Sequence, residues 1–254
     1  MNAPLDTDVA ISRLATAIGD ATRARILVSL MDGRARTGTE LGALAEVGPS
    51  TTSAHLHRLE AAQLITVRRQ GKHRYYSLRG TDVAGLLERL SALAGGSRAS
   101  FVCKAPQHLR AARTCYDHIA GTIGVALLER FTALGWLDPR SGDTDTSYEP
   151  SASGARAFAC LGIDLDAARA LRRRFAFGCL DWTERRHHLG GALGAAFLAL
   201  ARNRKWVIQD LDSRALRVTD HGRNEMAARF GMPMHEIRPG TLPRTPPGQR
   251  SVTT

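Results

Sequence analysis

The sequence predicts a mainly α-helical protein with short β-hairpins, an α+β chain in two parts. The first part, residues 1–95, places apolar side chains mostly at helical spacing and then changes to the alternating pattern typical of one β-hairpin. The second part repeats itself, since the run that begins at His118 returns 70 residues later at His188. We therefore expect an N-terminal group of helices with a hairpin, followed by two repeated helix–hairpin–helix units.

Composition indicates a folded protein with a polyanionic partner. Its 254 residues exceed one typical domain of about 100–150 residues, and a hydrophobic fraction of 43% argues against disorder. Lys and Arg number 35 against 24 Asp and Glu, which gives a net charge of +11 and a pI near 10.5. This excess favours nucleic acid first and an acidic membrane surface second.

The sequence also bears on the compartment of the protein. The N-terminus has neither a basic start nor an apolar run, so we expect no signal peptide. The longest nearly uninterrupted apolar stretch, Leu189–Ala201, is shorter than the ~20 residues that cross a bilayer. We expect a cytoplasmic protein with reduced thiols and no membrane partner, because four widely spaced cysteines are too few for a disulfide-framed module. These cysteines are Cys103, Cys115, Cys160 and Cys179.

The first two helices are predicted by periodicity and by their ends. Apolar residues between Val9 and Ile18 recur at helical spacing, and Gly19 ends this pattern. Asp20 can cap a second helix, which ends at Asp32-Gly33. The inward side chains of the second helix are expected to be Ile26, Leu27 and Leu30.

A third and a fourth helix complete a helix-turn-helix pair. The third follows Thr39 and ends near Val47-Gly48, and Pro49-Ser50 opens the fourth. A Gly-containing turn of about four residues separates the two helices, which is typical of a helix-turn-helix motif. The side chains expected to face inward are Leu41, Leu44, Leu56 and Leu59.

A hairpin and a fifth helix follow directly. Residues 64–68 and 74–78 are predicted as antiparallel strands around the turn 70–72, and a hairpin behind a helix-turn-helix is the wing of a winged helix. Asp82 begins a fifth helix with an apolar stripe that ends at Leu93. The boundaries we predict are a winged-helix DNA-binding and dimerisation domain at 1–95, a linker at 96–102, a duplicated sensor domain at 103–237 and a disordered tail at 238–254.

The chemistry of the winged-helix segment suits duplex DNA. The fourth helix offers short hydrogen-bonding groups that can reach base edges in the major groove, and the hairpin offers cations that can hold phosphates. A basic hairpin alone could be a solvated surface, but its position behind the helix pair favours DNA binding. The predicted DNA-binding residues are Ser50, Thr51, Thr52, Ser53, His55, His57 and Arg58 on the helix, and Arg68, Arg69, Lys72 and Arg74 on the hairpin.

The run from Leu14 to Leu78 resembles an ArsR-type (SmtB/ArsR) winged-helix repressor. The segments that carry the resemblance are Gly19–Leu27, Ser53–Leu56, Ala62–Ile65 and Gln70–Leu78. The resemblance implies a homodimer joined mainly through the first and fifth helices. It also implies an inverted-repeat operator in double-stranded DNA and release by an effector.

Three positions depart from the family pattern. The third helix, Glu40–Ala45, has neither a thiol nor a histidine, so the familiar cysteine-containing metal site is absent there. The fifth helix offers only Asp82 and Glu88, so the alternative Asp–His site is also missing. Ala54 replaces the Arg commonly found in the reading helix.

The C-terminal repeat suggests two helices that approach each other closely. Gly121 and Gly124 in the first copy correspond to Gly191 and Gly194 in the second, and Trp136 corresponds to Trp206. Glycine costs about 1 kcal/mol relative to alanine inside a helix, so several of them together indicate a close backbone neighbour. The two helices could cross near a pseudo-two-fold axis beside a small effector pocket, or they could simply pack tightly.

The cysteines and histidines of this part allow a metal site. Cys115 and His118 are three residues apart and would share one face of a helix, while Cys179 precedes His188 in the second copy. If the paired helices run parallel at their starts, the four side chains form a set of two sulfurs and two nitrogens for a soft ion such as Zn²⁺, Cd²⁺ or Cu⁺. An antiparallel arrangement would separate them. Inert packing and a redox- or electrophile-reactive thiol are the alternatives.

These observations predict a DNA-binding transcriptional regulator rather than an enzyme. We expect a homodimeric repressor that an effector releases from its operator, the effector being a metal ion, a thiol-reactive compound or a small molecule. One alternative is a DNA-binding domain fused to a Cys/His enzyme built from Cys115, Asp117, His118 and Cys179. Another is an architectural protein that binds DNA without sequence preference.

Overall fold

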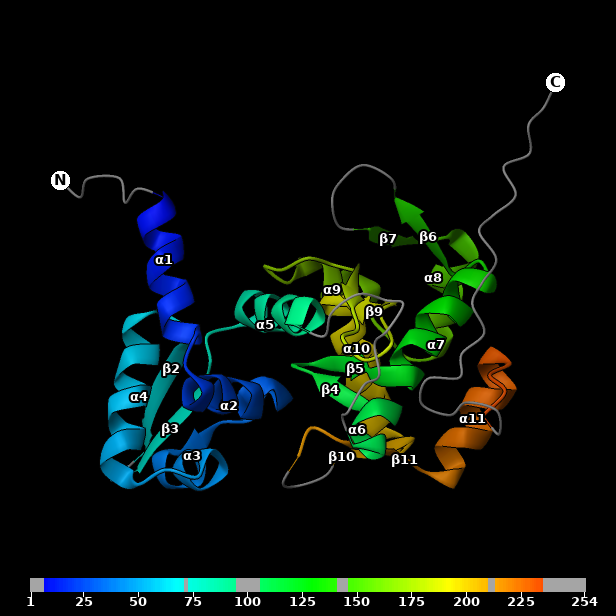
Figure 1. Cartoon of the computed structure of the whole chain (residues 1–254). Helices are drawn as coiled ribbons and strands as arrows, with labels where there is room; N and C mark the ends of the chain where they lie inside the picture. Colours follow the sequence, from blue (N-terminus) through cyan, green and yellow to red (C-terminus); the bar gives the residue numbers. More distant parts are fainter. Residues whose placement is uncertain (1–6, 71–72, 95–105, 141–145, 210–212, 235–254) are drawn as a thin grey trace.

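The computed structural model describes residues 7–70, 73–94, 106–140, 146–209 and 213–234, which form two lobes joined along helix α5 (Figure 1). The predicted linker 96–102, the predicted tail 238–254 and Lys72 lie outside the described residues. Among those residues, no helix combines the length and the apolar character that a bilayer crossing needs.

The N-terminal lobe has the predicted order of helices followed by a hairpin. Strands β2 and β3 pair along their length, from Ile65 opposite Leu78 to Gln70 opposite His73, and β1 adds a third antiparallel strand. This is the architecture of a winged helix. The elements are α1 (Thr7–Ile18), α2 (Ala21–Ser29), the 3₁₀-helix η1 (Leu30–Asp32), β1 (Arg36–Thr37), α3 (Gly38–Ala45), α4 (Pro49–Ala61), β2 (Ile65–Gln70), β3 (His73–Leu78) and α5 (Thr81–Ala94).

Capping residues fix where these short helices begin. The Asp20 side chain accepts a hydrogen bond from the backbone N–H of Arg23 (2.9 Å), as predicted for the cap of α2. Thr37 and Glu40 form a capping box at the start of α3, so this helix begins before Thr39. The inward orientation predicted for Leu44 is wrong, because the buried side chains of this two-turn helix are Leu41 and, four residues later, Ala45.

The C-terminal lobe alternates strand pairs with helices. The order strand, strand, helix, strand, strand, helix occurs twice, first from β4 to α8 and then from β8 to α11. Three antiparallel sheets result, with the orders β4-β5, β6-β7-β8-β9 and β10-β11. The elements are α6 (Gln107–Ala111), β4 (Arg113–Cys115), β5 (His118–Ala120), α7 (Gly121–Ala133), β6 (Leu137–Arg140), β7 (Ser147–Pro150), α8 (Ala152–Cys160), α9 (Leu165–Ala170), β8 (Phe177–Leu180), β9 (His187–Gly190), α10 (Gly191–Asn203), β10 (Val207–Gln209), β11 (Leu216–Val218) and α11 (Asp220–Phe230).

The repeat helix predicted to begin at His118 begins later, and the condition that Cys115 and His118 share a helix is not met. Both residues lie in a strand pair, and Tyr116 between them adopts a left-handed backbone conformation (φ 61°) that turns the chain back. The helix begins only at Gly121, whose φ of 81° and whose separation from the Arg110 carbonyl leave no room for a side chain. A Cβ atom at this position would lie 2.6 Å from that oxygen. The repeat therefore contains a strand pair that helical periodicity does not reveal.

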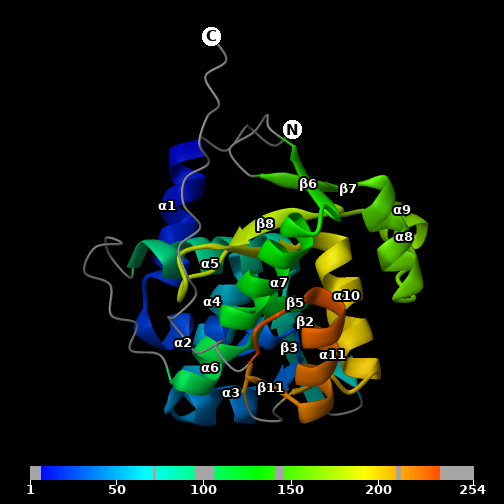
Figure 2. The same cartoon turned by 90° about the vertical axis from the view of Figure 1, so that its right-hand side faces the viewer.

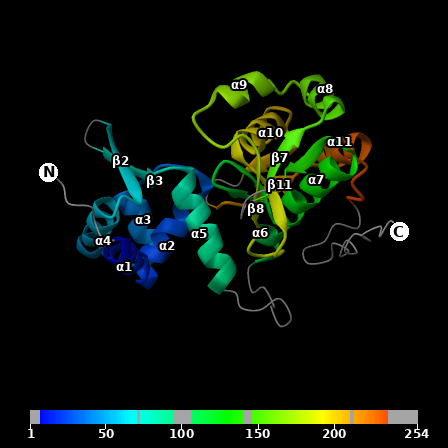
Figure 3. The ribbon, with the colours of Figure 1, turned by 90° about the horizontal axis from the view of Figure 1, so that it is seen from above.

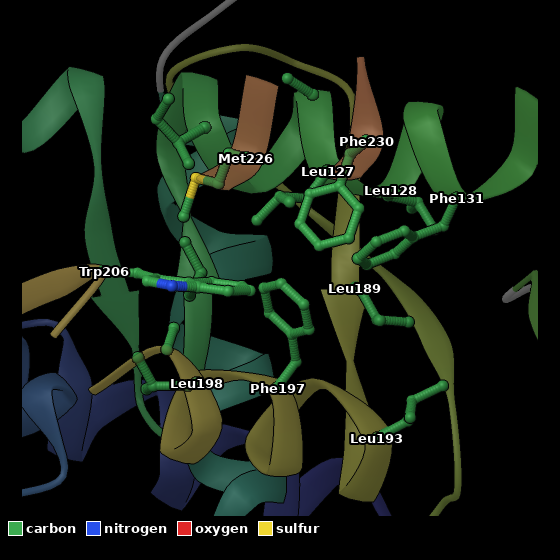
Figure 4. Packing of buried hydrophobic residues seen from close by; sticks show 14 of the residues in the cluster. Leu127, Leu128, Phe131, Leu189, Leu193, Phe197, Leu198, Trp206, Met226 and Phe230 are labelled. Atoms are coloured by element: carbon green, nitrogen blue, oxygen red, sulfur yellow. The ribbon is translucent and has the colours of Figure 1, made fainter. Parts of the chain in front are cut away.

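Aromatic side chains from both halves form the core of the C-terminal lobe. Phe131 on α7 stacks on Trp136 and meets Phe197 of α10 edge-to-face. Trp206 and Phe230 close the same cluster, as Figure 4 shows. Helix α11 lies beside α7 (Figure 2), where the Arg130 Nε donates a hydrogen bond to the Phe230 carbonyl (2.6 Å). The two halves thus share a single hydrophobic core.

The two lobes meet through α5 and the end of η1. Helix α5 runs between them, as the view from above shows (Figure 3), and it contacts strand β8. The backbone N–H of Tyr116, in the turn after β4, donates to the Met31 carbonyl (2.7 Å). The carboxylate of Glu88 on α5 contacts Arg214 of the C-terminal lobe (3.3 Å). Strands β4 and β8 of the C-terminal lobe are therefore in direct contact with η1 and α5 of the N-terminal lobe.

Candidate DNA-reading surface and buried cysteine–histidine cluster

The outward face of α4 carries short polar groups and cations. Its opposite face buries Leu56 and Leu59 in the core of the N-terminal lobe, which fixes the direction of the outward side chains. An exposed helix of this polarity fits the width of a major groove. The exposed side chains are Ser50, Thr51, Ser53, His57 and Arg58.

The exposure predicted for Thr52 is wrong. Its side chain is buried, and its hydroxyl donates a hydrogen bond to the Gly48 carbonyl (2.9 Å). Gly42 of α3 packs against it so closely that a Cβ there would lie 2.6 Å from the Thr52 hydroxyl oxygen. Thr52 therefore fixes the turn between α3 and α4 and does not face a ligand.

His55 is half-buried at the junction of α1, α2 and α4. Its Nδ1 lies 3.4 Å from an Arg23 guanidinium nitrogen and 3.8 Å from an Asp20 oxygen. Arg23 is itself held by the carbonyls of Thr16 and Ala17. These contacts orient α4 on the lobe, so His55 positions the reading helix more than it extends from it.

The hairpin presents three exposed arginines. Arg69 on β2 stands directly opposite Arg74 on β3, and Arg68 is the neighbour of Arg69 on the same strand. Like charges opposite each other destabilise a hairpin. Their presence in a strand pair is typical of a surface that meets phosphates, where each contact also releases counterions.

In the C-terminal lobe, strand pairing brings four potential ligands together. Cys115 of β4 stands opposite His118 of β5, and Cys179 of β8 stands opposite His188 of β9. Because β5 and β9 lie side by side, the two Cys–His pairs meet. One potential ligand atom from each of the four buried residues lies within 4.8 Å of the others. The two sulfurs are 3.9 Å apart, and the histidine ring centroids are 5.1 Å apart.

The glycines of α7 and α10 make this approach possible. A Cβ at Gly124 would lie 3.4 Å from the Cβ of His188, and a Cβ at Gly194 would lie 3.1 Å from the Cβ of His118. The histidine of each half therefore packs against the glycine of the helix in the other half. Between the helices the cavity measures only about 10 Å³, which holds a water at most. Two larger cavities of about 700 Å³ each lie beside the helices instead, one lined by Ile123 of α7 and the other by Ala192 and Ala196 of α10.

A buried carboxylate connects the cluster to α5. Asp181 accepts hydrogen bonds from Arg113 (3.0 Å) and from the backbone N–H of Gly121 (2.6 Å), and it lies 3.4 Å from the Nδ1 of His188. Arg113 is fully buried and also approaches Glu88 of α5 at 3.9 Å. The chain His188–Asp181–Arg113–Glu88 thus runs from the cluster to the helix between the lobes.

The electrostatics of the cluster favour positive charge at the histidines. Burial alone would raise the pKa of Asp181, but Arg113 and His188 outweigh it and hold that pKa well below its usual value. Burial opposes charge on His188, yet Asp181 and Cys115 raise its pKa to about 9. The contact with Cys179 and burial raise the pKa of the Cys115 thiol. These directions describe the metal-free protein, in which a bound ion would have to displace protons from the thiol and the imidazoles.

Comparison with known proteins identifies the regulatory family. Residues 20–67 match the family described as bacterial regulatory protein, arsR family. The HTH-type transcriptional regulator YdfF of Bacillus subtilis is 39% identical over 215 residues, which cover 84% of this chain and 93% of YdfF. The chain belongs to the arsR family of transcriptional regulators. As an arsR-family regulator, it binds DNA through the winged helix described above.

Other relatives of this arsR-family regulator match about a third of the chain. The HTH-type transcriptional regulator CmtR of Mycobacterium bovis is 36% identical over 81 residues, which cover 32% of this chain and 68% of CmtR. The homodimeric winged helix-turn-helix domain of Mb0332 from Mycobacterium bovis is 26% identical, with 37% of this chain and 90% of that chain covered and a TM-score of 0.33. Reduced HlyU of Vibrio cholerae is 28% identical, with 34% of this chain and 90% of that chain covered and a TM-score of 0.32.

Sequence reasoning about this arsR-family regulator singled out the four residues that cluster in the structure, but not the charged groups behind them. Arg113 and Asp181 are 68 residues apart and meet only in the folded lobe. Asp181 lies in the turn just after β8, two residues beyond Cys179, and no local pattern of the sequence marks it as a partner of Arg113. The sequence shows Glu88 only as an acidic residue of the fifth helix that lacks a histidine partner. In the structure, Glu88 contacts two buried arginines, Arg113 and Arg214.

Proposed function

We propose that this chain is a homodimeric repressor that reads an inverted-repeat operator and leaves it when an effector binds the C-terminal lobe. The observation that carries the proposal is the position of α5. One of its faces is packed against the C-terminal lobe through Glu88, and another exposes Leu90 and Leu93. A helix that contacts both the effector-binding lobe and the dimer interface can move when the effector binds. Such a movement would change the distance between the two α4 helices of the dimer.

The dimer interface we propose combines α1 and α5. Ile11 on α1 is 62% exposed and Leu93 on α5 is 78% exposed, with Val9 and Leu90 beside them in sequence. Leu90 and Leu93 are three residues apart and share one face of α5. Large exposed apolar side chains of this kind favour a partner surface. A two-fold axis through these helices would present two copies of α4 and of the hairpin to one face of a duplex.

Changing Leu93 to Lys tests the dimer. A symmetric interface contains the residue twice, so a loss of about 1.5 kcal/mol per copy raises the dimer dissociation constant about 100-fold. Sedimentation equilibrium measures this constant. Leu171→Lys is the matched control, because Leu171 is an exposed leucine outside α1 and α5. Equal dissociation constants for the two variants would contradict the interface.

Changing Arg69 to Ala tests the hairpin. We expect weaker binding to every duplex, and a slope of log K against log salt smaller by about 1, because one phosphate contact is lost. Fluorescence anisotropy with a fragment of the protein's own promoter and a scrambled fragment measures both quantities. Arg140→Ala, an exposed arginine on β6, is the control and keeps the wild-type slope.

Changing Ser53 and His57 together to Ala tests base reading. These exposed side chains of α4 reach base edges in the proposed complex, so we expect the ratio of promoter to scrambled affinity to fall about 10-fold or more. The slope of log K against log salt should stay unchanged, because the phosphate contacts of the hairpin remain. A wild-type protein that binds both fragments equally would overturn operator recognition and favour an architectural role.

The C-terminal lobe serves regulation in this proposal, and not catalysis. Cys115 and Cys179 are buried, whereas a nucleophilic thiol needs access for its substrate. We propose that the protein acts in the cytoplasm with both thiols reduced. We also propose that residues 103–237 are a duplicated unit, supported by the two equal runs of strands and helices.

A further inference from the structure

We propose that Cys115, His118, Cys179 and His188 bind one soft divalent metal ion of the zinc and cadmium class, and that this ion is the effector. The proposal that these residues bind a metal ion does not depend on DNA binding. The proposal that the ion is the effector rests on the proposed function. The site lies outside residues 20–67, which match the family description.

The sulfur geometry fits an ion better than a disulfide. Two thiolates on one tetrahedral zinc, each about 2.3 Å from it, lie about 3.8 Å apart. The sulfurs of Cys115 and Cys179 are 3.9 Å apart, whereas a disulfide needs about 2.05 Å. The four ligand atoms all lie within 4.8 Å of one another, so the histidines need to close by at most about 1.5 Å to reach the separations of a tetrahedral site.

The histidines are oriented as metal ligands. The Nδ1 of His118 lies 3.2 Å from Asp117, and the Nδ1 of His188 lies 3.4 Å from Asp181. Metal-bound histidines usually direct their second nitrogen at such a carboxylate, which fixes the tautomer and the ring. The Nε2 atoms of both histidines are buried and find no hydrogen-bond partner among the described residues, and the contact of the His188 Nδ1 with Asp181 is an ionic approach without hydrogen-bond geometry. A buried nitrogen without a partner is costly, and a metal ion would satisfy both.

The charges around the cluster select a dication. Each supporting carboxylate is already paired with an arginine, Asp181 with Arg113 and Asp117 with Arg173. The two cysteine thiolates therefore leave a charge of −2 for the ion to balance. A divalent ion makes the buried site neutral, whereas Cu⁺ would leave one uncompensated charge, which is expensive in a protein interior. Sulfur and imidazole ligands exclude hard ions such as Mg²⁺ and Ca²⁺.

Metal titration of the full-length chain tests the site. Protein stripped by chelator and fully reduced is titrated with Cd²⁺ under nitrogen. We expect one ion per chain and a cadmium–thiolate absorption band that saturates at this ratio. Cys115→Ser and His188→Gln are expected to lower the affinity for Cd²⁺ more than about 100-fold. This loss exceeds the 10–100-fold that is typical when a residue behind a metal ligand is changed. Cys160→Ser and His221→Gln, exposed residues of the same lobe, keep wild-type affinity.

A second measurement covers variants that fail to fold. Ions that bind only the native state raise its melting temperature, so Zn²⁺ must stabilise the wild type by an amount that grows with its concentration. Absence of this shift, or equal binding by Cys115→Ser, overturns the site. A Cys115–Cys179 disulfide after mild oxidation, without metal binding, also overturns it and favours redox sensing.

Operator binding separates the two proposals. If the chain binds one ion and the ion leaves promoter affinity unchanged, the metal site stands and its effector role fails. If the chain recognises its promoter but binds no ion, the repressor stands and the metal site fails. The expected result is that one equivalent of Zn²⁺ or Cd²⁺ lowers promoter affinity, and that Cys115→Ser abolishes this response while keeping metal-free affinity.

Discussion

Replacing Asp181 by Ala is expected to lower the free energy of unfolding by about 3–5 kcal/mol, because it leaves Arg113 as a buried charge without its closest partner. The same change removes the acceptor for the backbone N–H of Gly121 and for the N–H and hydroxyl of Thr183. Chemical denaturation of the metal-free protein, followed by tryptophan fluorescence, measures the loss.

Asp138→Ala is the control for this prediction. Asp138 is an exposed aspartate on β6 of the same lobe, so its removal should change the free energy of unfolding by less than about 0.5 kcal/mol. If Asp181→Ala were equally mild, the buried network would not stabilise the lobe. A double variant, Asp181→Asn with Arg113→Met, should recover part of the loss, since it removes both charges.

Replacing Glu88 by Gln is expected to separate metal binding from operator release. Glu88 contacts Arg113 and Arg214 but lies outside the four ligands, so the affinity for Cd²⁺ should stay within about 3-fold of wild type, below the change typical of an outer-shell partner. The ion-dependent loss of promoter affinity should shrink 5-fold or more, which is about 1 kcal/mol of coupling free energy. Anisotropy titrations with and without one equivalent of Cd²⁺ measure it.

One outcome would contradict this prediction. An unchanged ion response in Glu88→Gln would show that the contact between α5 and Arg113 does not transmit binding. The remaining route would then be the backbone contact from Tyr116 to Met31 at the end of η1. Glu60→Gln on α4 is the control, because it changes the same charge on the N-terminal lobe without a contact to the C-terminal lobe among the described residues.

The N-terminal lobe could be predicted because its signals are local. Caps, helical periodicity and a hairpin turn lie within a few residues of the elements that they determine, as Asp20 and α2 illustrate. The error at Thr52 was avoidable, since Thr52, Leu56 and Leu59 have the i, i+4, i+7 spacing of one buried face. Polar character alone suggested exposure, whereas the hydroxyl is satisfied by a carbonyl of the preceding turn.

The C-terminal lobe could be predicted only in part because its site depends on distant pairings. The repeat identified His118 and His188 as equivalent, but strands of three or four residues give no clear alternation. Whether the two Cys–His pairs meet depends on how β5 lies beside β9, which no local pattern encodes. Asp117 and Asp181 support the histidines from different turns, and their arginine partners lie more than fifty residues away.

Helix α5 presents its buried acid to one lobe and its leucines to the proposed second protomer. In a symmetric assembly, each sensor would therefore stand one helix away from the molecular dyad. A conformational change caused by the first metal ion would reach the second subunit before that subunit binds its own ion. The dose–response of such a switch would be steeper than a simple hyperbola, and half-loaded molecules would already hold the operator less firmly.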